Sequence, residues 1–138
     1  YYHRLTLIDD LTKVDDDILK LAIYDSIGAE TNSAMAFSEF ATNYKVTVSG
    51  HEWLDITNLE ASKGDAIIRA RNKFKISKEE TMAFGDYLND MEMMQEAGQS
   101  YAMKNAHPDI IKASRFVTEY DNNNNGVVHT IRKKVLGL

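Results

Sequence analysis

The spacing of apolar and polar positions differs between two stretches of the chain. Residues 45–57 contain two runs of β-branched and aromatic residues that meet at Gly50-His51, which is typical of a β-hairpin. Further along, short apolar runs alternate with helical patterns of about ten residues, which indicates βαβ crossovers and a parallel sheet. We therefore expect an α/β protein in which residues 1–57 form an α+β unit and residues 58–138 form part of a doubly wound sheet with helices on both faces.

Local patterns predict the individual elements. The apolar run Leu5–Ile8 predicts a strand, and the acidic Asp15–Asp17 favours the N-terminus of a helix that continues to Asp25. A capping pattern at Ser62 predicts the start of another helix. Later strands are expected at residues 81–84, 101–103 and 115–118, and helices at residues 90–97 (closed by Gly98), 108–113 and 127–136.

Composition narrows the possible functions. The 138 residues are 43% apolar and 27% charged with a single proline, as in a folded globular domain. The net charge of −5 argues against nucleic-acid binding, which requires clustered basic residues. No apolar run approaches the ~20 residues of a membrane span. Because the chain also has no cysteine and no signal-peptide pattern, we expect a cytoplasmic protein without a membrane partner.

The most distinctive local feature is the segment Phe84–Asp90, in which an apolar strand ends at a glycine and is followed by two carboxylates and a carboxamide. Ligands of open α/β sheets bind outside the carboxyl ends of the strands. Asp86 and Asp90 can hold a hard cation such as Mg²⁺, which needs only one or two protein carboxylates beside phosphate and water. A turn at Asp86 and a helix cap at Asn89 or Asp90 explain the same residues equally well.

Lys63 is the second candidate, because it stands with Gly64 at a predicted helix start, where an ammonium and free backbone N–H groups favour an anion. A lysine at a helix start is otherwise a solvated surface residue. One helix and one strand separate Lys63 from Asp86, and this spacing brings two successive segments to the same edge of a sheet.

Five segments in order resemble the motifs of the haloacid dehalogenase (HAD) superfamily, specifically the C-terminal portion of its Cof-type phosphatases, which carry a type IIB cap. The resemblance covers Leu54 to about Leu136, and residues 1–53 are more loosely similar to the later part of the mobile cap. The segments are Ser62-Lys63-Gly64, Ala83–Met91, Ala102–Ala106, Val117-Thr118 and Asn125-Gly126-Val127.

The resemblance implies a partial HAD-like Rossmannoid core after part of an α+β cap, with Mg²⁺ as cofactor and a small phosphorylated metabolite, such as a sugar phosphate, as substrate. Lys63 and Asp86 would be catalytic, with Lys63 contacting the transferring phosphoryl group. Asn89 would also bind the phosphate. Asp86 would be a metal ligand, and Asp90 would support the metal directly or through water. Asn105 would orient the site.

One expected motif is missing. The family uses an aspartate nucleophile in a D-x-D-x-T strand end, which forms an aspartyl phosphate. Asp9-Asp10-Leu11-Thr12 has leucine in place of the second aspartate, and Asp15-Asp16-Asp17 has Leu19 in place of the threonine. A motif-two serine or threonine is not identifiable either. We therefore expect the chain to be a C-terminal fragment of a phosphatase and to be inactive as given.

Two other functions fit the same residues. A degenerate phosphatase that keeps its Mg²⁺ and phosphate contacts would act as a binding module for metabolites. A receiver-like signalling domain shares the doubly wound architecture, but Asp86 lacks an acidic pair at an earlier strand end. If part of the sheet is missing, an unpaired strand edge is exposed, and self-association through that edge is expected.

Overall fold

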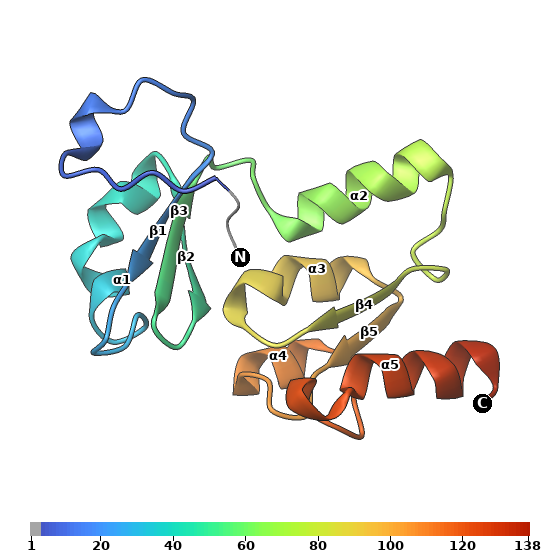
Figure 1. The fold of residues 1–138 in the computed structure, drawn as a ribbon. Coiled ribbons are helices and arrows are strands. Elements are labelled where there is room, and N and C mark those ends of the chain that lie inside the picture. The colour runs from blue at the N-terminus through green and yellow to red at the C-terminus, as the bar shows by residue number, and fades with distance from the viewer. Residues whose placement is uncertain (1–3) are drawn as a thin grey trace.

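Two three-stranded sheets form the framework of the chain, and they differ in strand direction (Figure 1). The computed structural model describes residues 4–138. The first sheet is antiparallel with the order β1-β3-β2, and the second is parallel with the order β4-β5-β6. The strands are β1 (Lys20–Tyr24), β2 (Lys45–Gly50), β3 (Trp53–Thr57), β4 (Met82–Gly85), β5 (Gln99–Ala102) and β6 (Phe116–Val117).

The predicted hairpin is confirmed as β2 and β3. Leu54 and Ile56 of β3 are buried, whereas Asp55 and Thr57 alternate with them along the strand and face the other side of the sheet. The sheet therefore has one apolar and one polar face. The apolar face packs against the segment that contains α1 (Ser33–Ala36) and the 3₁₀ helix η2 (Ser38–Thr42).

The structure corrects the prediction for the beginning of the chain. Leu5–Ile8 is not a strand, and the side chains of Leu5 and Leu7 are 73% and 89% exposed. Asp15–Asp17 does not begin a helix, because the following residues form β1, which pairs with β3 along its whole length. This pairing supplies backbone hydrogen bonds and a sheet neighbour, whereas a short helix without a packed apolar face is only marginally stable.

The second sheet carries helices on both faces, as predicted. Met94 and Ile110 pack with Ala83 and Ala102 on one face, while Tyr101 lies beside the C-terminal helix on the other. Figure 1 shows α3 and α5 on opposite sides of β4 and β5. The helices are α2 (Lys63–Phe74), α3 (Met91–Glu96), α4 (Pro108–Ala113) and α5 (Gly126–Ile131, continued by the π-helical Arg132–Leu136), with 3₁₀ turns at Leu11–Lys13, Leu88–Asp90 (η3) and Asn122–Asn124 (η4).

Gly98 follows α3 as predicted, but for a different reason. It does not adopt a left-handed conformation, and the residue that ends the helix, Ala97, is extended. A Cβ atom on Gly98 would lie 2.5 Å from the carbonyl oxygen of Lys78 and 2.7 Å from the Cα of Glu79. Close approach of two backbone segments, rather than helix capping, therefore requires glycine here.

The regions around the two sheets touch through side chains. Lys45 of β2 forms an ion pair with Glu92 of α3, and His107 lies 3.5 Å from the Glu30 carboxylate. Tyr87 packs against the apolar face of the first sheet. None of the helices within residues 4–138 is long and apolar enough to cross a membrane. The division into domains near Asn58 stays a prediction.

Candidate active site

Lys63 is the first residue of α2, and its position follows from how that helix begins. The Ser62 hydroxyl accepts a hydrogen bond from the backbone N–H of Asp65 at 3.0 Å, which caps the helix. A Cβ atom on Gly64 would lie 2.5 Å from the Cβ of Glu92, so glycine allows α2 to pack closely on α3. The cap and the close packing together place the Lys63 side chain against the loop after β4.

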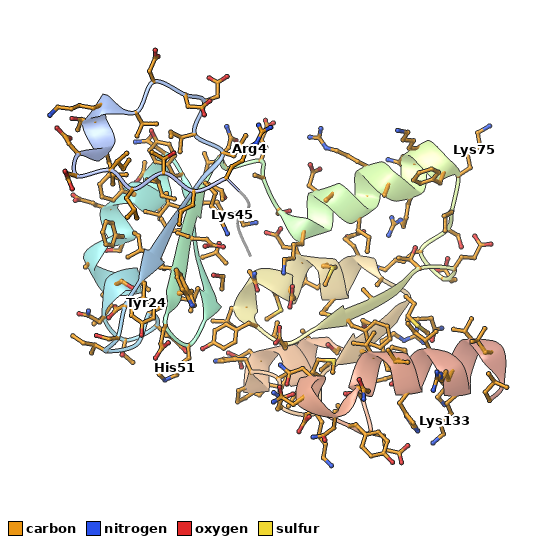
Figure 2. The ribbon with its side chains drawn as sticks, viewed as in Figure 1. Arg4, Tyr24, Lys45, His51, Lys75 and Lys133 are labelled. Carbon is orange, nitrogen blue, oxygen red and sulfur yellow. The ribbon has the colours of Figure 1, made fainter. Side chains whose placement is uncertain are left out.

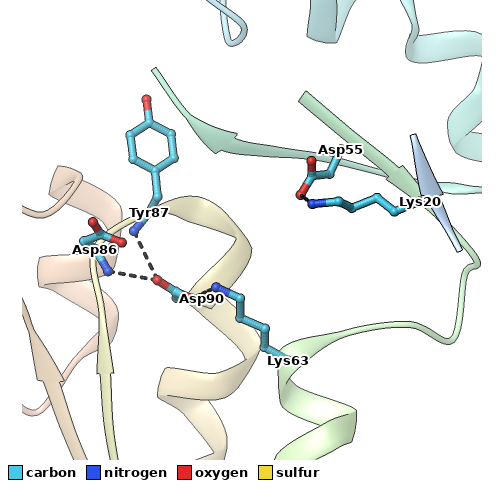
Figure 3. Close-up of polar contacts among 6 residues, drawn as sticks. All are labelled: Lys20, Asp55, Lys63, Asp86, Tyr87 and Asp90. Atoms are coloured by element: carbon cyan, nitrogen blue, oxygen red, sulfur yellow. Dashed lines mark hydrogen bonds and ion pairs between the residues drawn. The ribbon is translucent and has the colours of Figure 1, made fainter. Parts of the chain in front are cut away.

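Asp90 is the centre of that loop. Its Oδ1 accepts a hydrogen bond from Lys63 Nζ at 2.6 Å, and its Oδ2 accepts from the backbone N–H groups of Asp86 at 2.9 Å and Tyr87 at 3.3 Å (Figure 3). Asp90 is only 3% exposed. A Cβ atom on Gly85 would lie 2.7 Å from the Cβ of Asp90. The glycine before Asp86 therefore lets the loop fold back over the end of its own strand.

Asp86 is half-buried directly after β4. Burial raises the pKa of its carboxyl above the ordinary value, and the negative charge of Asp90 raises it further. The Lys63 ammonium acts in the opposite direction and favours the carboxylate. The site thus combines two acids and one cation at the carboxyl end of a parallel strand, where ligands of open α/β sheets bind.

Lys63 and Asn89 share a cleft of about 700 Å³ with the polar face of the first sheet. The structure therefore brings these two predicted phosphate-binding residues to one surface, and it brings Lys63, Asp86 and Asp90 into one network. The rest of the cleft is lined by residues from the first sheet, from the segment between β3 and α2, and from α2, namely Lys20, Lys45, Thr47, Asp55, Thr57, Asn58, Glu60, Ala61, Ser62, Asp65, Ala66 and Arg69.

Mg²⁺ is the predicted cofactor, and the residues present fit part of its coordination shell. An adjacent cation would compensate for the burial of the Asp86 carboxylate. Both oxygens of Asp90 already accept hydrogen bonds, which suits a residue that orients the loop or reaches the ion through water. Within residues 4–138 no three His, Cys, Asp or Glu side chains form a metal-binding group. The chain fits one or two ligands, to which phosphate and water are added.

Asn105 lies outside the cleft lining. Its Nδ2 donates to Oδ1 of Asn122 at 2.9 Å, and its Oδ1 accepts from the backbone N–H of Asn122 at 3.3 Å. These bonds tie the loop after β5 to the 3₁₀ turn η4. Its predicted role in orienting the site stays a prediction.

The polar face of the first sheet lines the cleft, and the sequence pattern does not predict this. The alternation of Leu54 and Ile56 with Asp55 and Thr57 is visible in the sequence, and it signals a two-faced strand. Which residues of β1 and β2 lie beside Asp55 and Thr57, however, depends on strand pairing between residues far apart in the chain. The sequence pattern predicts a helix at Lys20, and only the pairing of β1 with β3 places this residue opposite Thr57.

Comparison with known proteins places these observations in a family. The sequence-family model of the haloacid dehalogenase-like hydrolases matches residues 2–131 of the chain. The 5-amino-6-(5-phospho-D-ribitylamino)uracil phosphatase YbjI of Escherichia coli (strain K12) is 29% identical over 134 residues, 96% of this chain and 49% of that protein. Phosphatase YwpJ of Bacillus subtilis (strain 168) is 36% identical over 94 residues, 68% of this chain and 33% of that protein. The chain thus spans half or less of the length of these relatives.

Solved structures agree with the sequence relatives. A haloacid dehalogenase-like hydrolase from B. subtilis is 29% identical, with a TM-score of 0.76 over 91% of this chain and 44% of that chain. The HAD subclass IIB sugar phosphatase BT4131 is 22% identical, with a TM-score of 0.69 over 86% of this chain and 44% of that chain, and shares the fold. The family match and the similar structures show that the chain belongs to the haloacid dehalogenase-like hydrolases, in their Cof-type branch.

Proposed function

We propose that this chain supplies the lysine and acid motifs of a Mg²⁺-dependent phosphatase for small phosphorylated metabolites such as sugar phosphates. The observation that carries the proposal is the network of Lys63, Asp90 and Asp86 at the carboxyl end of β4, next to a cleft that Asn89 also lines. The relatives YbjI and YwpJ are both named as phosphatases, and this supports the proposal.

Each residue has a chemical role in this proposal. The Lys63 ammonium offsets the negative charge of the transferring phosphoryl group, and the Asn89 carboxamide donates a hydrogen bond to it. Asp86 holds Mg²⁺, and Asp90 keeps Asp86 and Lys63 at a fixed spacing. Mg²⁺, when bound, supplies positive charge next to the phosphoryl oxygens.

The nucleophile is a separate matter, because no D-x-D-x-T segment occurs in the sequence. We place the nucleophilic aspartate, which would form the aspartyl phosphate, outside these 138 residues. Without it the phosphoryl group has no acceptor on the protein, and we expect the chain by itself to be inactive.

The test is Mg²⁺-dependent hydrolysis of p-nitrophenyl phosphate. The chain alone should show no turnover above background. A protein that joins this chain to an upstream segment carrying D-x-D-x-T should hydrolyse the compound and lose activity on Asp86→Ala. Robust turnover by the chain alone, abolished by Asp86→Ala, would place the nucleophile within these residues and contradict the proposal.

A further inference from the structure

The loop after β4 contains two kinds of side chain, which lie in different surroundings. Asp86, Asn89 and Asp90 belong to the candidate site. Tyr87 and Leu88 lie between them in sequence and pack against the apolar cluster of the first sheet. Figure 3 shows the Tyr87 side chain pointing away from Asp86 and Asp90. The loop that carries the proposed metal ligand is therefore also part of the hydrophobic core of the other sheet.

This apolar cluster is the buried side of β2 and β3 with the segment that covers it. Its buried members are Ala29, Val48 and Leu54, and Tyr87 and Leu88 are among the half-buried residues that pack around them. Val48 is paired with Leu54 across the two strands. The contact removes apolar surface from water, which stabilises it, and close packing restricts where the two loop side chains can lie.

Hydrogen bonds hold the backbone on both sides of the Tyr87 side chain. Asp90 Oδ2 accepts from the backbone N–H groups of Asp86 and Tyr87, as described above. The Asp86 carbonyl accepts from the backbone N–H of His107 at 2.8 Å. The His107 ring also meets the Tyr87 ring edge-on, with 5.5 Å between the ring centroids. A displaced Tyr87 ring would therefore pull on the same peptide groups that these bonds hold.

We propose that Tyr87 and Leu88 are positioning residues, which hold the Asp86 carboxylate and the Asn89 carboxamide in place through the apolar cluster of the first sheet. This inference rests on the proposed function, in which Asp86 is the metal ligand. Residues that orient a metal ligand change the affinity for the metal when they are substituted. The first sheet then affects Mg²⁺ binding beside the second sheet through packing, without supplying a ligand.

Tyr24 offers a matched control, because it is a tyrosine of the first sheet that does not pack on the loop. It lies on β1, at the opposite edge of the sheet from β2, and Figure 2 shows it away from the second sheet. Its ring packs edge-on against Trp53, with 5.2 Å between the centroids, and the residue is 56% exposed. Tyr24→Ala therefore removes the same atoms as Tyr87→Ala at a position that does not hold the loop.

Amide hydrogen exchange of the whole chain, followed by NMR, tests whether the loop is held in this way. In Tyr87→Ala the amide of Asp86 should exchange roughly tenfold faster than in wild type. The amide of Thr118, which donates to the Ala102 carbonyl at 2.9 Å in the second sheet, should keep its rate. Tyr87→Phe, which retains the ring, and Tyr24→Ala should leave both amides unchanged.

The second measurement is the Mg²⁺ concentration that gives half-maximal hydrolysis of p-nitrophenyl phosphate by the chain joined to a segment carrying D-x-D-x-T. Tyr87→Ala should raise this concentration roughly tenfold, and Tyr87→Phe should restore the wild-type value. Tyr24→Ala should leave it unchanged. A general loss of stability would lower the amount of folded enzyme and hence the maximal rate, but would not change the Mg²⁺ dependence of the folded fraction.

The outcomes separate the inference from the proposed function. A wild-type exchange rate at Asp86 in Tyr87→Ala overturns the inference, and so does equal acceleration at Thr118, which reports unfolding of the whole chain. Faster exchange with an unchanged Mg²⁺ dependence overturns it as well. Each of these results leaves the proposed function in place. Tyr87→Leu, a smaller truncation, decides the matter by the same criteria if Tyr87→Ala does not fold. Absence of Mg²⁺-dependent turnover in the joined wild-type protein overturns the proposed function and the inference together.

Discussion

At the scale of single residues, Asp90 combines almost complete burial with a charge and three hydrogen bonds. Lys63 satisfies one of its oxygens, and the backbone N–H groups of Asp86 and Tyr87 satisfy the other. Lys63 itself is half-exposed, so it keeps contact with water and with any ligand in the cleft. Asp90 therefore orients the loop, while Lys63 and Asp86 remain available for chemistry.

This division of roles predicts that Asp90→Ala destabilises the chain by about 1–3 kcal/mol, because it leaves two loop N–H groups without their acceptor. Asp90→Asn keeps an oxygen for these N–H groups and should cost less. Urea denaturation measures both changes in the free energy of unfolding. Lys112→Ala, at an exposed ion pair, is the control and should stay within about 0.5 kcal/mol of wild type. Equal stability of Asp90→Ala and wild type would show that the bonds to Asp90 do not hold the loop.

Asp25 plays a similar orienting role after β1. Its Oδ1 accepts from the backbone N–H of Ile27 at 2.9 Å, and its Oδ2 accepts from Ser33 N–H at 2.9 Å and Asn32 Nδ2 at 3.0 Å. The hydrogen bond from Ile27 is the largest cause that lowers the pKa of Asp25 below its ordinary value of 3.8.

A carboxyl with a lowered pKa in the folded state stabilises the fold above its unfolded pKa, and this contribution is lost as the pH falls through the folded pKa. The stability difference between wild type and Asp25→Ala should therefore be constant well above pH 3.8 and shrink below it. Urea midpoints across a pH series measure this difference. A difference that grows as the pH falls below 3.8 would contradict the assignment.

At the scale of elements, the close packing of α2 on α3 brings Lys63 to the loop after β4. Gly64 permits this packing because it has no Cβ atom. A Cβ atom at this position would lie 2.5 Å from the Cβ of Glu92 and 3.0 Å from its backbone carbonyl carbon. The backbone of α3 cannot move aside without shifting Asp90, which directly precedes the helix.

Gly64→Ala should consequently destabilise the chain by roughly 1–3 kcal/mol, since it forces the two helices apart. The matched control is Gly50→Ala, where the nearest atom would lie at an ordinary contact distance of 3.5 Å and the backbone is not left-handed. Thermal or urea denaturation distinguishes the two variants. If both lose the same stability, the packing of α2 on α3 is not limited by Gly64.

Several of these elements could be predicted from the sequence, and the reasons are local. The capping pattern at Ser62, the apolar strand before Gly85 and the alternation in β3 each lie within a few residues. β1 could not be predicted, because Lys20–Tyr24 fits both a helical and an extended pattern and only pairing with β3 decides between them. The polar side of the cleft could not be predicted for the same reason, since Lys20 and Asp55 meet through the pairing of β1 with β3.

At the scale of the whole molecule, the second sheet ends at β4, which pairs with β5 alone among the described strands. The loop that follows β4 carries Asp86 and Asp90 of the candidate site. The unpaired strand edge and the site without an identified nucleophile therefore lie at the same strand. An unpaired strand edge is a template for pairing with another chain.

We therefore expect the isolated chain to self-associate through the free edge of β4. Light scattering should show a mean mass that rises with protein concentration. A strictly monomeric mass at high concentration would contradict this expectation. A protein that includes an upstream strand to pair with β4 should remain monomeric under the same conditions, if β4 is the edge involved.

We propose that Lys63 and Asp86 of this chain serve a Mg²⁺-dependent phosphatase whose nucleophile lies elsewhere. The most direct measurement is the rate of p-nitrophenyl phosphate hydrolysis by a protein that joins the chain to a segment carrying D-x-D-x-T, with and without Mg²⁺. We expect Mg²⁺-dependent turnover that falls at least ~100-fold in Asp86→Ala and in Lys63→Met. Turnover that is independent of Mg²⁺, or that survives both substitutions, would contradict it.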